Sequence, residues 1–130
     1  MLRGKKILIG VTGSIAAYKI ATLIRFLVKK KAFVQVIMTE DAKEFITPLT
    51  LSTLSNNPVH YLFTDDKDSG EWNNHVELGS WADVFIISPA TANTLYKIAN
   101  GHCDNLLIAT YLSAKCTVYI APAMDLDMYK

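Results

Sequence analysis

Small and hydroxyl-bearing residues follow the first apolar run of the chain. Thr12, Gly13 and Ser14 come directly after the run at residues 6–11 and form a turn directly before a helical pattern. A glycine lets the backbone turn closely, and the first N–H groups of a helix have no partner within the helix, so such a turn can bind an anion. A tight turn with a serine helix cap and no ligand fits the same residues equally well.

Three further apolar runs end in residues of the same kind, namely Met38-Thr39, Ser88-Pro89-Ala90-Thr91 and Ala121-Pro122-Ala123-Met124. In open parallel sheets, ligands bind beyond the carboxyl ends of the strands, where the strand order reverses. We therefore expect these segments to surround one ligand. The spacing Gly10-x-x-Gly13-x-x-Ala16 matches neither G-x-G-x-x-G nor the phosphate loop of NTPases, which disfavours a nicotinamide dehydrogenase and NTP hydrolysis.

His75 is the histidine best placed for acid–base chemistry, because it follows a polar segment and precedes the partly apolar Val76-Glu77-Leu78. Histidine titrates near neutral pH and can act as a general base, although an isolated histidine is more often a surface or packing residue. The histidines and cysteines lack the spacing of metal ligands, so we expect no metal site.

Alternating patterns predict the elements that position these residues. Apolar runs at 6–11 and 84–88 are typical of buried parallel strands, 33–38 is expected to be a second strand parallel to the first and 117–120 the last strand, and a brief strand fits 59–63. Helices are expected over 15–30, 39–46, 48–55, 91–99 and 105–114, with Thr47 and Asp104 as caps and 64–74 as an exposed loop. Strands alternating with helices predict an α/β fold with a three-layer, doubly wound parallel sheet.

Length and composition narrow the class of protein. The chain has 130 residues, 13 basic against 12 acidic, and 51% hydrophobic residues, which predicts one folded domain over 1–130. The near-neutral balance offers no basic face for nucleic acid, and no apolar run approaches the roughly 18 residues that span a membrane. Cys103 and Cys116 form no C-x-x-C pair, which favours a reducing cytoplasm, and we expect both to be buried.

Several motifs, in order along nearly the whole chain, resemble the flavin-containing cysteine decarboxylases. They are Gly13-Ser14-Ile15-Ala16-Ala17-Tyr18-Lys19, His75-Val76-Glu77-Leu78, Pro89-Ala90-Thr91-Ala92-Asn93-Thr94, the run from Lys97 to Leu107, and Pro122-Ala123-Met124 with Met128. The resemblance implies a Rossmann-like flavoprotein fold with FMN across the strand ends and its phosphate near the first turn. The implied FMN-binding residues are Gly13, Ser14, Ile15, Thr39, Ser88, Pro89, Ala90, Thr91 and Asn93.

The resemblance also implies a reaction. Its nearest members decarboxylate 4'-phosphopantothenoylcysteine to 4'-phosphopantetheine in coenzyme A biosynthesis: the flavin oxidises the substrate's thiol, and the thioaldehyde-like product takes up the electrons released as carbon dioxide leaves. By this resemblance His75 assists proton removal, while Asn93 with Ala123, Met124 and Asp125 holds the substrate carboxylate. The family forms trimers or multiples of trimers, with FMN at a subunit interface.

Two features depart from the family pattern. Asp125 stands where the family usually has asparagine, and a carboxylate there repels a substrate carboxylate unless one of them is protonated or paired. The sequence ends at Lys130, so we expect it to lack the family's mobile substrate lid, the lid cysteine and any synthetase domain. The alternatives are a non-catalytic FMN-binding scaffold or regulatory flavoprotein, and a peptidyl-cysteine decarboxylase.

Overall fold

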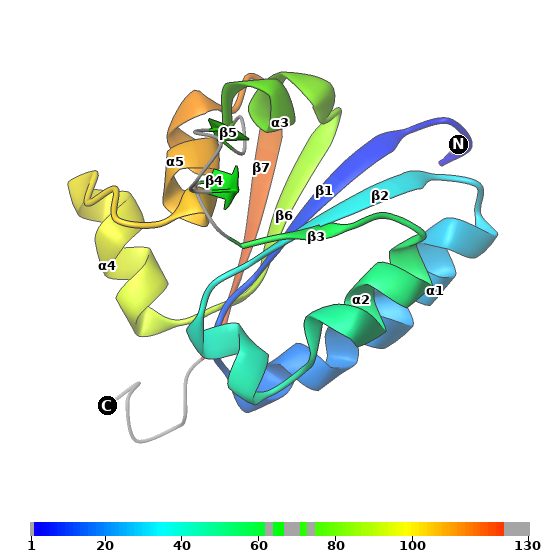
Figure 1. The fold of residues 1–130 in the computed structure, drawn as a ribbon, viewed down its shortest axis with the longest axis horizontal. Helices are drawn as coiled ribbons and strands as arrows, with labels where there is room; N and C mark the ends of the chain where they lie inside the picture. The colour runs from blue at the N-terminus through cyan, green and yellow to red at the C-terminus, as the bar shows by residue number, and fades with distance from the viewer. Residues whose placement is uncertain (1, 62–63, 67–70, 73–74, 124–130) are drawn as a thin grey trace.

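A five-stranded parallel sheet forms the centre of the protein, seen in a computed structural model that describes residues 2–61, 64–66, 71–72 and 75–123. The strand order is β3-β2-β1-β6-β7 (Figure 1). The strands are β1 (Lys6–Val11), β2 (Phe33–Met38), β3 (Val59–His60), β6 (Val84–Ala90) and β7 (Thr117–Pro122).

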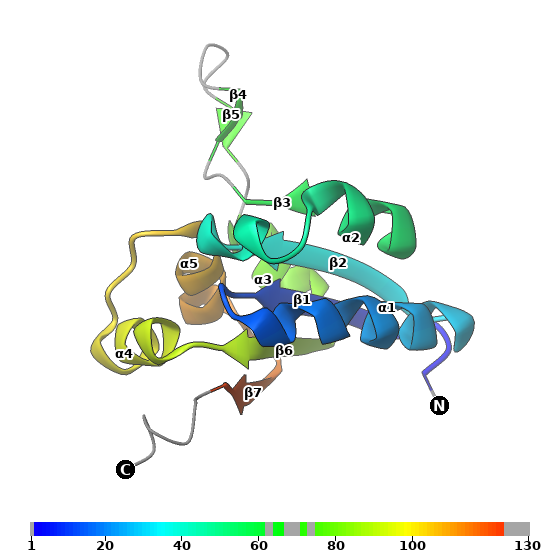
Figure 2. The same ribbon diagram turned by 90° about the horizontal axis from the view of Figure 1, so that it is seen from below.

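Helices cover the two faces of this sheet (Figures 1 and 2). On one face, Ile7 and Ile9 of β1 share a buried core with α1 (Ile20–Lys29) and α2 (Pro48–Ser55). On the other face, Leu8 packs in a second core with α3 (His75–Trp81) and α5 (Leu106–Ser113). Successive side chains of a strand point to opposite faces, so a strand covered on both sides must be apolar throughout. The predicted three-layer, doubly wound fold is confirmed.

The strand order reverses between β1 and β6. From β1 the chain crosses through α1 to β2 on one side, and from β6 it crosses to β7 on the other through α4 (Ala92–Asn100) and α5. Connections that diverge in this way leave a crevice above the carboxyl ends of the two strands. The segments predicted to surround one ligand follow strands that end along this edge.

Local signals in the sequence set several helix ends. Thr47 caps α2, its Oγ1 accepting a hydrogen bond from the Thr50 N–H at 3.1 Å, and Pro48 takes the first helical position. Gly101 ends α4 with a φ of 64°, a conformation that favours glycine. These caps follow from side-chain chemistry within a few residues and are visible in the sequence.

Two predicted helices are shorter or tighter than expected. The pattern over 15–30 divides into a 3-10 helix, η1 (Ile15–Lys19), and α1, with the Ala16 N–H bound to Ser14 Oγ at 3.3 Å. The expected helix over 39–46 is the single 3-10 turn η2 (Asp41–Glu44). Tight 3-10 turns are common at helix ends and as connectors, and their apolar spacing resembles that of an α-helix.

The expectation of a loop over 64–74 is wrong. Within this segment, β4 (Thr64–Asp66) and β5 (Glu71–Trp72) form a short antiparallel pair, with Thr64 opposite Trp72. Polar strands this short carry no apolar alternation, so the sequence pattern does not reveal them. The brief strand expected over 59–63 is confirmed for β3, and residues 62–63 lie outside the described part.

The predicted cap at Asp104 is also wrong, because Asn105 caps α5. Asn105 Oδ1 accepts a hydrogen bond from the Ile108 N–H at 2.9 Å, while Asp104 pairs with Lys97 instead. Either residue type suits a cap, and only the folded backbone selects one. Among the described residues, no helix is long and apolar enough to cross a membrane.

Candidate functional site

Two adjoining hollows lie at the carboxyl edge of the sheet and share Gly13, Thr91 and Asn93. Their volumes are about 340 Å³ and 750 Å³, within the usual range of ligand pockets. The first is also lined by Thr39, Glu40, Asp41, Thr94, Lys97, Asp104 and Asn105. The second is also lined by Ser14, Ile15, Ala16, Phe45, Ala92, Pro122 and Ala123.

Gly13 permits a close contact between the first turn and η2. A Cβ atom at Gly13 would lie 2.6 Å from Asp41 Cβ and 3.1 Å from the Asp41 carbonyl carbon. Real Cβ atoms essentially never come as close as 2.6 Å to another heavy atom, so a side chain at this position would have to shift the turn or η2. The sequence predicted that this glycine lets the backbone turn closely, and the structure shows that it also makes room for Asp41.

The same turn offers fewer free amides than the sequence suggested. The Ser14 N–H donates to the Thr12 carbonyl at 3.0 Å, and the Ala16 N–H donates to Ser14 Oγ. Among the turn residues described, the N–H groups of Gly13 and Ile15 have no such partner. An anion in this turn would therefore meet two backbone donors rather than a full helix end.

Thr39 carries a buried hydroxyl without a partner. Its N–H donates to the Val11 carbonyl at 3.1 Å, which extends the pairing of β2 with β1 by one residue. Its Oγ1 is buried and makes no hydrogen bond within the described structure, although Thr39 lines the first hollow. Buried hydroxyls are nearly always hydrogen-bonded, so this atom marks a place where a ligand could supply the partner.

Thr12, the first residue of the predicted turn after β1, joins the ends of β1 and β6. Its buried Oγ1 donates to the Pro89 carbonyl and accepts a hydrogen bond from the Thr91 N–H at 3.1 Å. Pro89 and Ala90 are themselves buried, so of the Ser88–Thr91 segment Thr91 faces the hollows. A threonine directly after the first strand is the signal that could have drawn attention to Thr12.

Charged residues line the first hollow unevenly. Glu40, Asp41 and Asp104 contribute carboxylates, and Lys97 contributes an ammonium group. Lys97 Nζ lies 3.0 Å from Asp104 Oδ1, and this hydrogen bond holds the pKa of Asp104 below its usual value. Within this hollow, the sequence analysis did not single out these four residues as ligand contacts, because charge alone does not show which way a surface side chain lies.

His75 does not line either hollow. It is half-buried at the start of α3, which packs so closely on α5 that a Cβ at Gly79 would lie 3.0 Å from the Ser113 carbonyl oxygen. Asn93 thus lines both hollows, and His75 lines neither of them. Ala123 does reach the second hollow, where its N–H donates to the Ala90 carbonyl at 3.0 Å. The expected substrate contacts Met124 and Asp125 lie outside the described residues.

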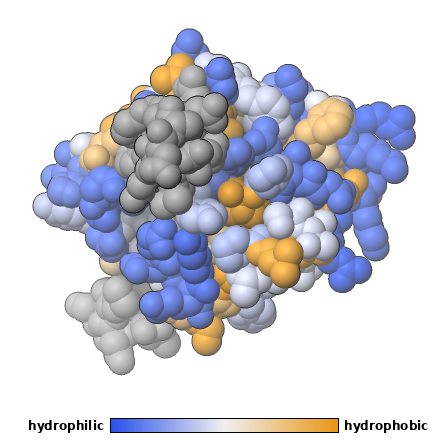
Figure 3. All heavy atoms as spheres, viewed as in Figure 1, coloured by the Kyte–Doolittle hydropathy of each residue, from blue (hydrophilic) through white to orange (hydrophobic). Residues whose placement is uncertain are grey.

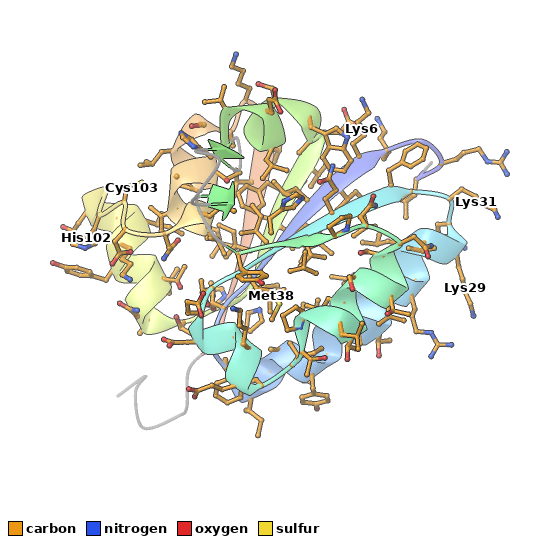
Figure 4. The ribbon with its side chains drawn as sticks, viewed as in Figure 1. Lys6, Lys29, Lys31, Met38, His102 and Cys103 are labelled. Carbon is orange, nitrogen blue, oxygen red and sulfur yellow. The ribbon has the colours of Figure 1, made fainter. Side chains whose placement is uncertain are left out.

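The cysteines differ from what the sequence suggested. Cys103 is exposed beside His102 in the connection from α4 to α5, whereas Cys116 is partly buried, which raises the pKa of its thiol (Figure 4). A neighbourhood of charged residues, with Asp104 bound to both Lys97 and His102, keeps the Cys103 segment at the surface. The described part of the chain holds no group of three His, Cys, Asp or Glu side chains suited to a metal.

Comparisons with known proteins place this arrangement among its relatives. A model of the family described as Flavoprotein matches residues 1–130. A cysteine/cysteine sulfinic acid decarboxylase from an unknown prokaryotic organism is 61% identical over 83 residues, covering 64% of this chain and 23% of that protein. The coenzyme A biosynthesis bifunctional protein CoaBC of Vibrio cholerae is 46% identical over 129 residues, covering 99% of this chain and 32% of that protein.

Solved structures show the same fold. The FMN-dependent cysteine decarboxylase SpaF superposes with a TM-score of 0.88 at 32% identity, covering all of this chain and 74% of that one. A mutant of PPC decarboxylase complexed with pantothenoylaminoethenethiol gives a TM-score of 0.80 at 32% identity, covering 98% of this chain and 71% of that one. Against the curated relatives, however, the chain spans only about a quarter to a third of their length.

Proposed function

The chain belongs to the flavoprotein family, and from this premise we propose that it binds FMN at the carboxyl edge of its sheet and decarboxylates 4'-phosphopantothenoylcysteine to 4'-phosphopantetheine in the cytoplasm. The observation that carries the proposal is the family match over the whole chain together with 46% identity to CoaBC over 99% of it. The FMN-binding region then comprises residues 1–130 as one domain.

The residues at the carboxyl edge suit a phosphorylated flavin. The Gly13 amide and the unpartnered Thr39 hydroxyl are donors beside the first hollow, and the Ile15 amide lies beside the second; backbone amides at a helix start are donors of a kind that binds phosphate. Ser14 stands between the two amides and lines the second hollow, which is the larger and more apolar space suited to a ring system. Thr91 and Asn93 line both hollows and complete the proposed contacts, and Ser88, Pro89 and Ala90, which line neither hollow, are proposed to support FMN through the β6–α4 connection.

When bound, FMN supplies an acceptor for the electrons removed from the substrate's thiol. The chain's own residues bind and orient the reactants. Asn93 lines both hollows and offers an amide that can hydrogen-bond a carboxylate between them, with Ala123 beside it. We assign to His75 the removal of the thiol proton, and to Met124 and Asp125 further contacts with the substrate.

The position of His75 favours a site built from more than one copy of the chain. In a single copy His75 is not among the residues that line the two hollows, and Ile15, a large apolar residue that lines the second hollow, is 76% exposed. Exposed apolar residues beside a cleft are typical of a surface that another protein covers. We therefore propose a trimer, or a multiple of trimers, in which a second copy brings its His75 to the FMN site.

A second substrate class is favoured by one specific observation. The cysteine/cysteine sulfinic acid decarboxylase shares 61% identity with this chain, more than CoaBC does, although over 64% of the chain. Both candidates place a carboxylate and a sulfur on adjacent carbons, so the same hollows suit either. They differ at the nitrogen on the carbon that carries the carboxylate. In one candidate this nitrogen is an amide that bears a long phosphorylated arm, and in the other it is a free ammonium group.

Carbon dioxide release from the FMN-loaded chain tests the proposal. Purified chain with FMN is given 4'-phosphopantothenoylcysteine, cysteine, cysteine sulfinic acid or a peptide ending in cysteine, in separate reactions. We expect the first to turn over fastest. Faster release from cysteine sulfinic acid would favour the second candidate, and faster release from the peptide a peptidyl-cysteine decarboxylase. Bound FMN with no release from any substrate would support a non-catalytic scaffold.

A His75→Asn variant tests the proposed role of His75 in turnover and should leave FMN binding unchanged. Asparagine keeps a polar side chain but cannot take up a proton near neutral pH, so turnover should fall by about 100-fold or more while FMN stays bound. Unchanged turnover in this variant would remove His75 from the proposed role.

A further inference from the structure

We infer that Thr12 is a positioning residue for the FMN site, one whose buried hydroxyl fixes the start of α4 against the end of β1. The inference rests on the proposed binding of FMN at the carboxyl edge, and it adds a residue that does not itself line either hollow. Thr12 is 1% exposed, so its side chain acts from behind the site.

The hydroxyl joins two segments that are distant in the sequence. Thr12 Oγ1 donates its hydrogen to the Pro89 carbonyl, and the same oxygen accepts a hydrogen bond from the Thr91 N–H at 3.1 Å. These partners lie 77 and 79 residues further along the chain. One side chain thus satisfies an acceptor and a donor of the β6–α4 connection, at the point where the strand order reverses.

Thr91, held by Thr12, in turn fixes the start of α4. The Thr91 Oγ1 accepts from the Thr94 N–H at 3.2 Å and lies 3.1 Å from Thr94 Oγ1, so Thr91 caps the helix that begins at Ala92. Asn93 lies in the first turn of that helix and lines both hollows, as Thr91 does. The hydrogen bond from Thr91 to Thr12 therefore also sets where Asn93 stands.

The opposite wall of the hollows is next to Thr12 in the chain. Gly13 lines both hollows, and its contact with Asp41 leaves the turn little room to shift. The Thr12 hydroxyl hence sets the separation between the phosphate side and the α4 side of the site before the ligand arrives. A site held in its binding geometry loses less free energy on ordering, so it binds more tightly.

Only a hydroxyl-bearing side chain serves here. Valine has nearly the shape of threonine, but it would leave the Pro89 carbonyl and the Thr91 N–H buried without partners. Serine keeps the hydroxyl and loses one methyl group. The pair Thr12→Val and Thr12→Ser therefore separates the hydrogen bonds from the packing.

Thr110 provides a matched control. It is also fully buried, and its Oγ1 donates to the Leu106 carbonyl at 2.9 Å, but this bond lies within α5 and away from the hollows. Thr110→Val removes a buried hydroxyl by the same substitution. It should destabilise the chain without moving the FMN site.

The test measures FMN affinity by titration of the cofactor-free chain, with flavin fluorescence as the signal, for the wild type and the three variants. We expect Thr12→Val to weaken FMN binding by at least about 10-fold and to shift the visible absorption bands of the bound flavin. Thr12→Ser should bind within about threefold of the wild type, and Thr110→Val within about twofold.

A second measurement needs no variant. Hydrogen exchange of the Thr91 amide in the cofactor-free wild type should be slow, because the bond to Thr12 exists before FMN binds. Fast exchange at Thr91, unchanged affinity in Thr12→Val, an equal loss in Thr110→Val, or failure of Thr12→Ser to restore binding would each overturn the inference. A wild type that binds FMN but releases no carbon dioxide contradicts the proposed reaction and leaves the role of Thr12 standing, whereas a wild type that binds no FMN overturns both.

Discussion

The two ends of the parallel sheet each carry a hollow, and they are built from different chemistry. At the amino end, a hollow of about 510 Å³ is lined by Leu2, Arg3, Lys29, Lys30 and Lys31. At the carboxyl edge, two hollows of similar size are lined by glycine, hydroxyl groups, two side-chain amides, the carboxylates of Glu40 and Asp41, and a lysine paired with an aspartate. Figure 4 labels Lys29 and Lys31 at the first end and Met38, the last residue of β2, at the other.

The cations at the amino end have an explanation that needs no ligand. Lys29 is the last residue of α1, and Lys30 and Lys31 follow it, where positive charge is favourable beside the negative end of the helix dipole. These side chains are exposed, and Lys30 Nζ lies 5.6 Å from the centre of the Phe26 ring. The space-filling view likewise shows hydrophobic residues as separate patches among hydrophilic ones (Figure 3).

The carboxyl edge differs because its polar groups are fixed. Thr12, Thr91 and Asn105 are each held by hydrogen bonds to the backbone of another residue, and the Thr39 hydroxyl is buried with its bonding capacity unused. The comparison shows that neither volume nor charge identifies a ligand site in this fold. What marks the site is a set of polar atoms held in place by the backbone, one of them without a partner.

Glycine substitutions at the two ends should give the largest contrast. Gly13→Ala brings a Cβ within 2.6 Å of Asp41 and displaces the turn, so FMN affinity should fall by about 100-fold. Gly4 has a φ of 77° and open space around it, so Gly4→Ala should lower the free energy of unfolding by about 1 kcal/mol and leave FMN affinity unchanged. Flavin titration and denaturant unfolding measure the two quantities. Equal FMN affinity in both variants would contradict the distinction between the two ends.

Thr39→Val should change FMN affinity and the stability of the cofactor-free chain in opposite directions. Valine removes the unpartnered hydroxyl, so FMN affinity should fall by about 10-fold while the cofactor-free chain becomes more stable by up to about 1 kcal/mol. The control is Thr47→Val, which deletes the capping hydroxyl of α2 and should lower stability by about 1 kcal/mol with FMN affinity intact. A loss of stability in Thr39→Val would mean that the hydroxyl already has a partner in the free protein.

Lys31→Gly should have the smallest effect on the contrast between the two ends, because it changes stability at the amino end and not FMN affinity. Lys31 has a φ of 67°, a conformation that glycine adopts without strain, so the substitution should raise the free energy of unfolding by about 1 kcal/mol. Thermal unfolding of the cofactor-free chain measures the gain. FMN affinity should stay within about twofold of the wild type, and a larger change would show that the amino end communicates with the site.

Much of the fold was predictable because its signals are local. The apolar runs of β1, β2, β6 and β7 appear directly in the sequence, as do the Thr47 cap with Pro48 and the glycine that ends α4. The exceptions are β4 and β5, which are polar and short, and the choice of Asn105 over Asp104 as a cap. In each exception the residue types allow two structures, strand or loop for β4 and β5 and either residue as the cap of α5, and only contacts in the folded chain select one.

The candidate site was predictable in part. Gly13, Ser14, Ile15, Thr39, Thr91, Asn93 and Ala123 were singled out as contacts and do line the hollows. Thr12 was not singled out, because nothing in its own neighbourhood of the sequence shows that its partners come from β6. Lys97 and Asp104 also line the first hollow, and their residue types alone do not predict this.

The sequence by itself determined the order of strands and helices and the residue types at the strand ends, because periodicity and capping act over a few residues. Tertiary structure alone decided which hydroxyl is buried without a partner, which glycine is crowded, and that Asn93 lines the hollows while His75 does not. These properties depend on contacts between segments that are distant along the chain, and the local pattern of residues does not encode where such segments meet.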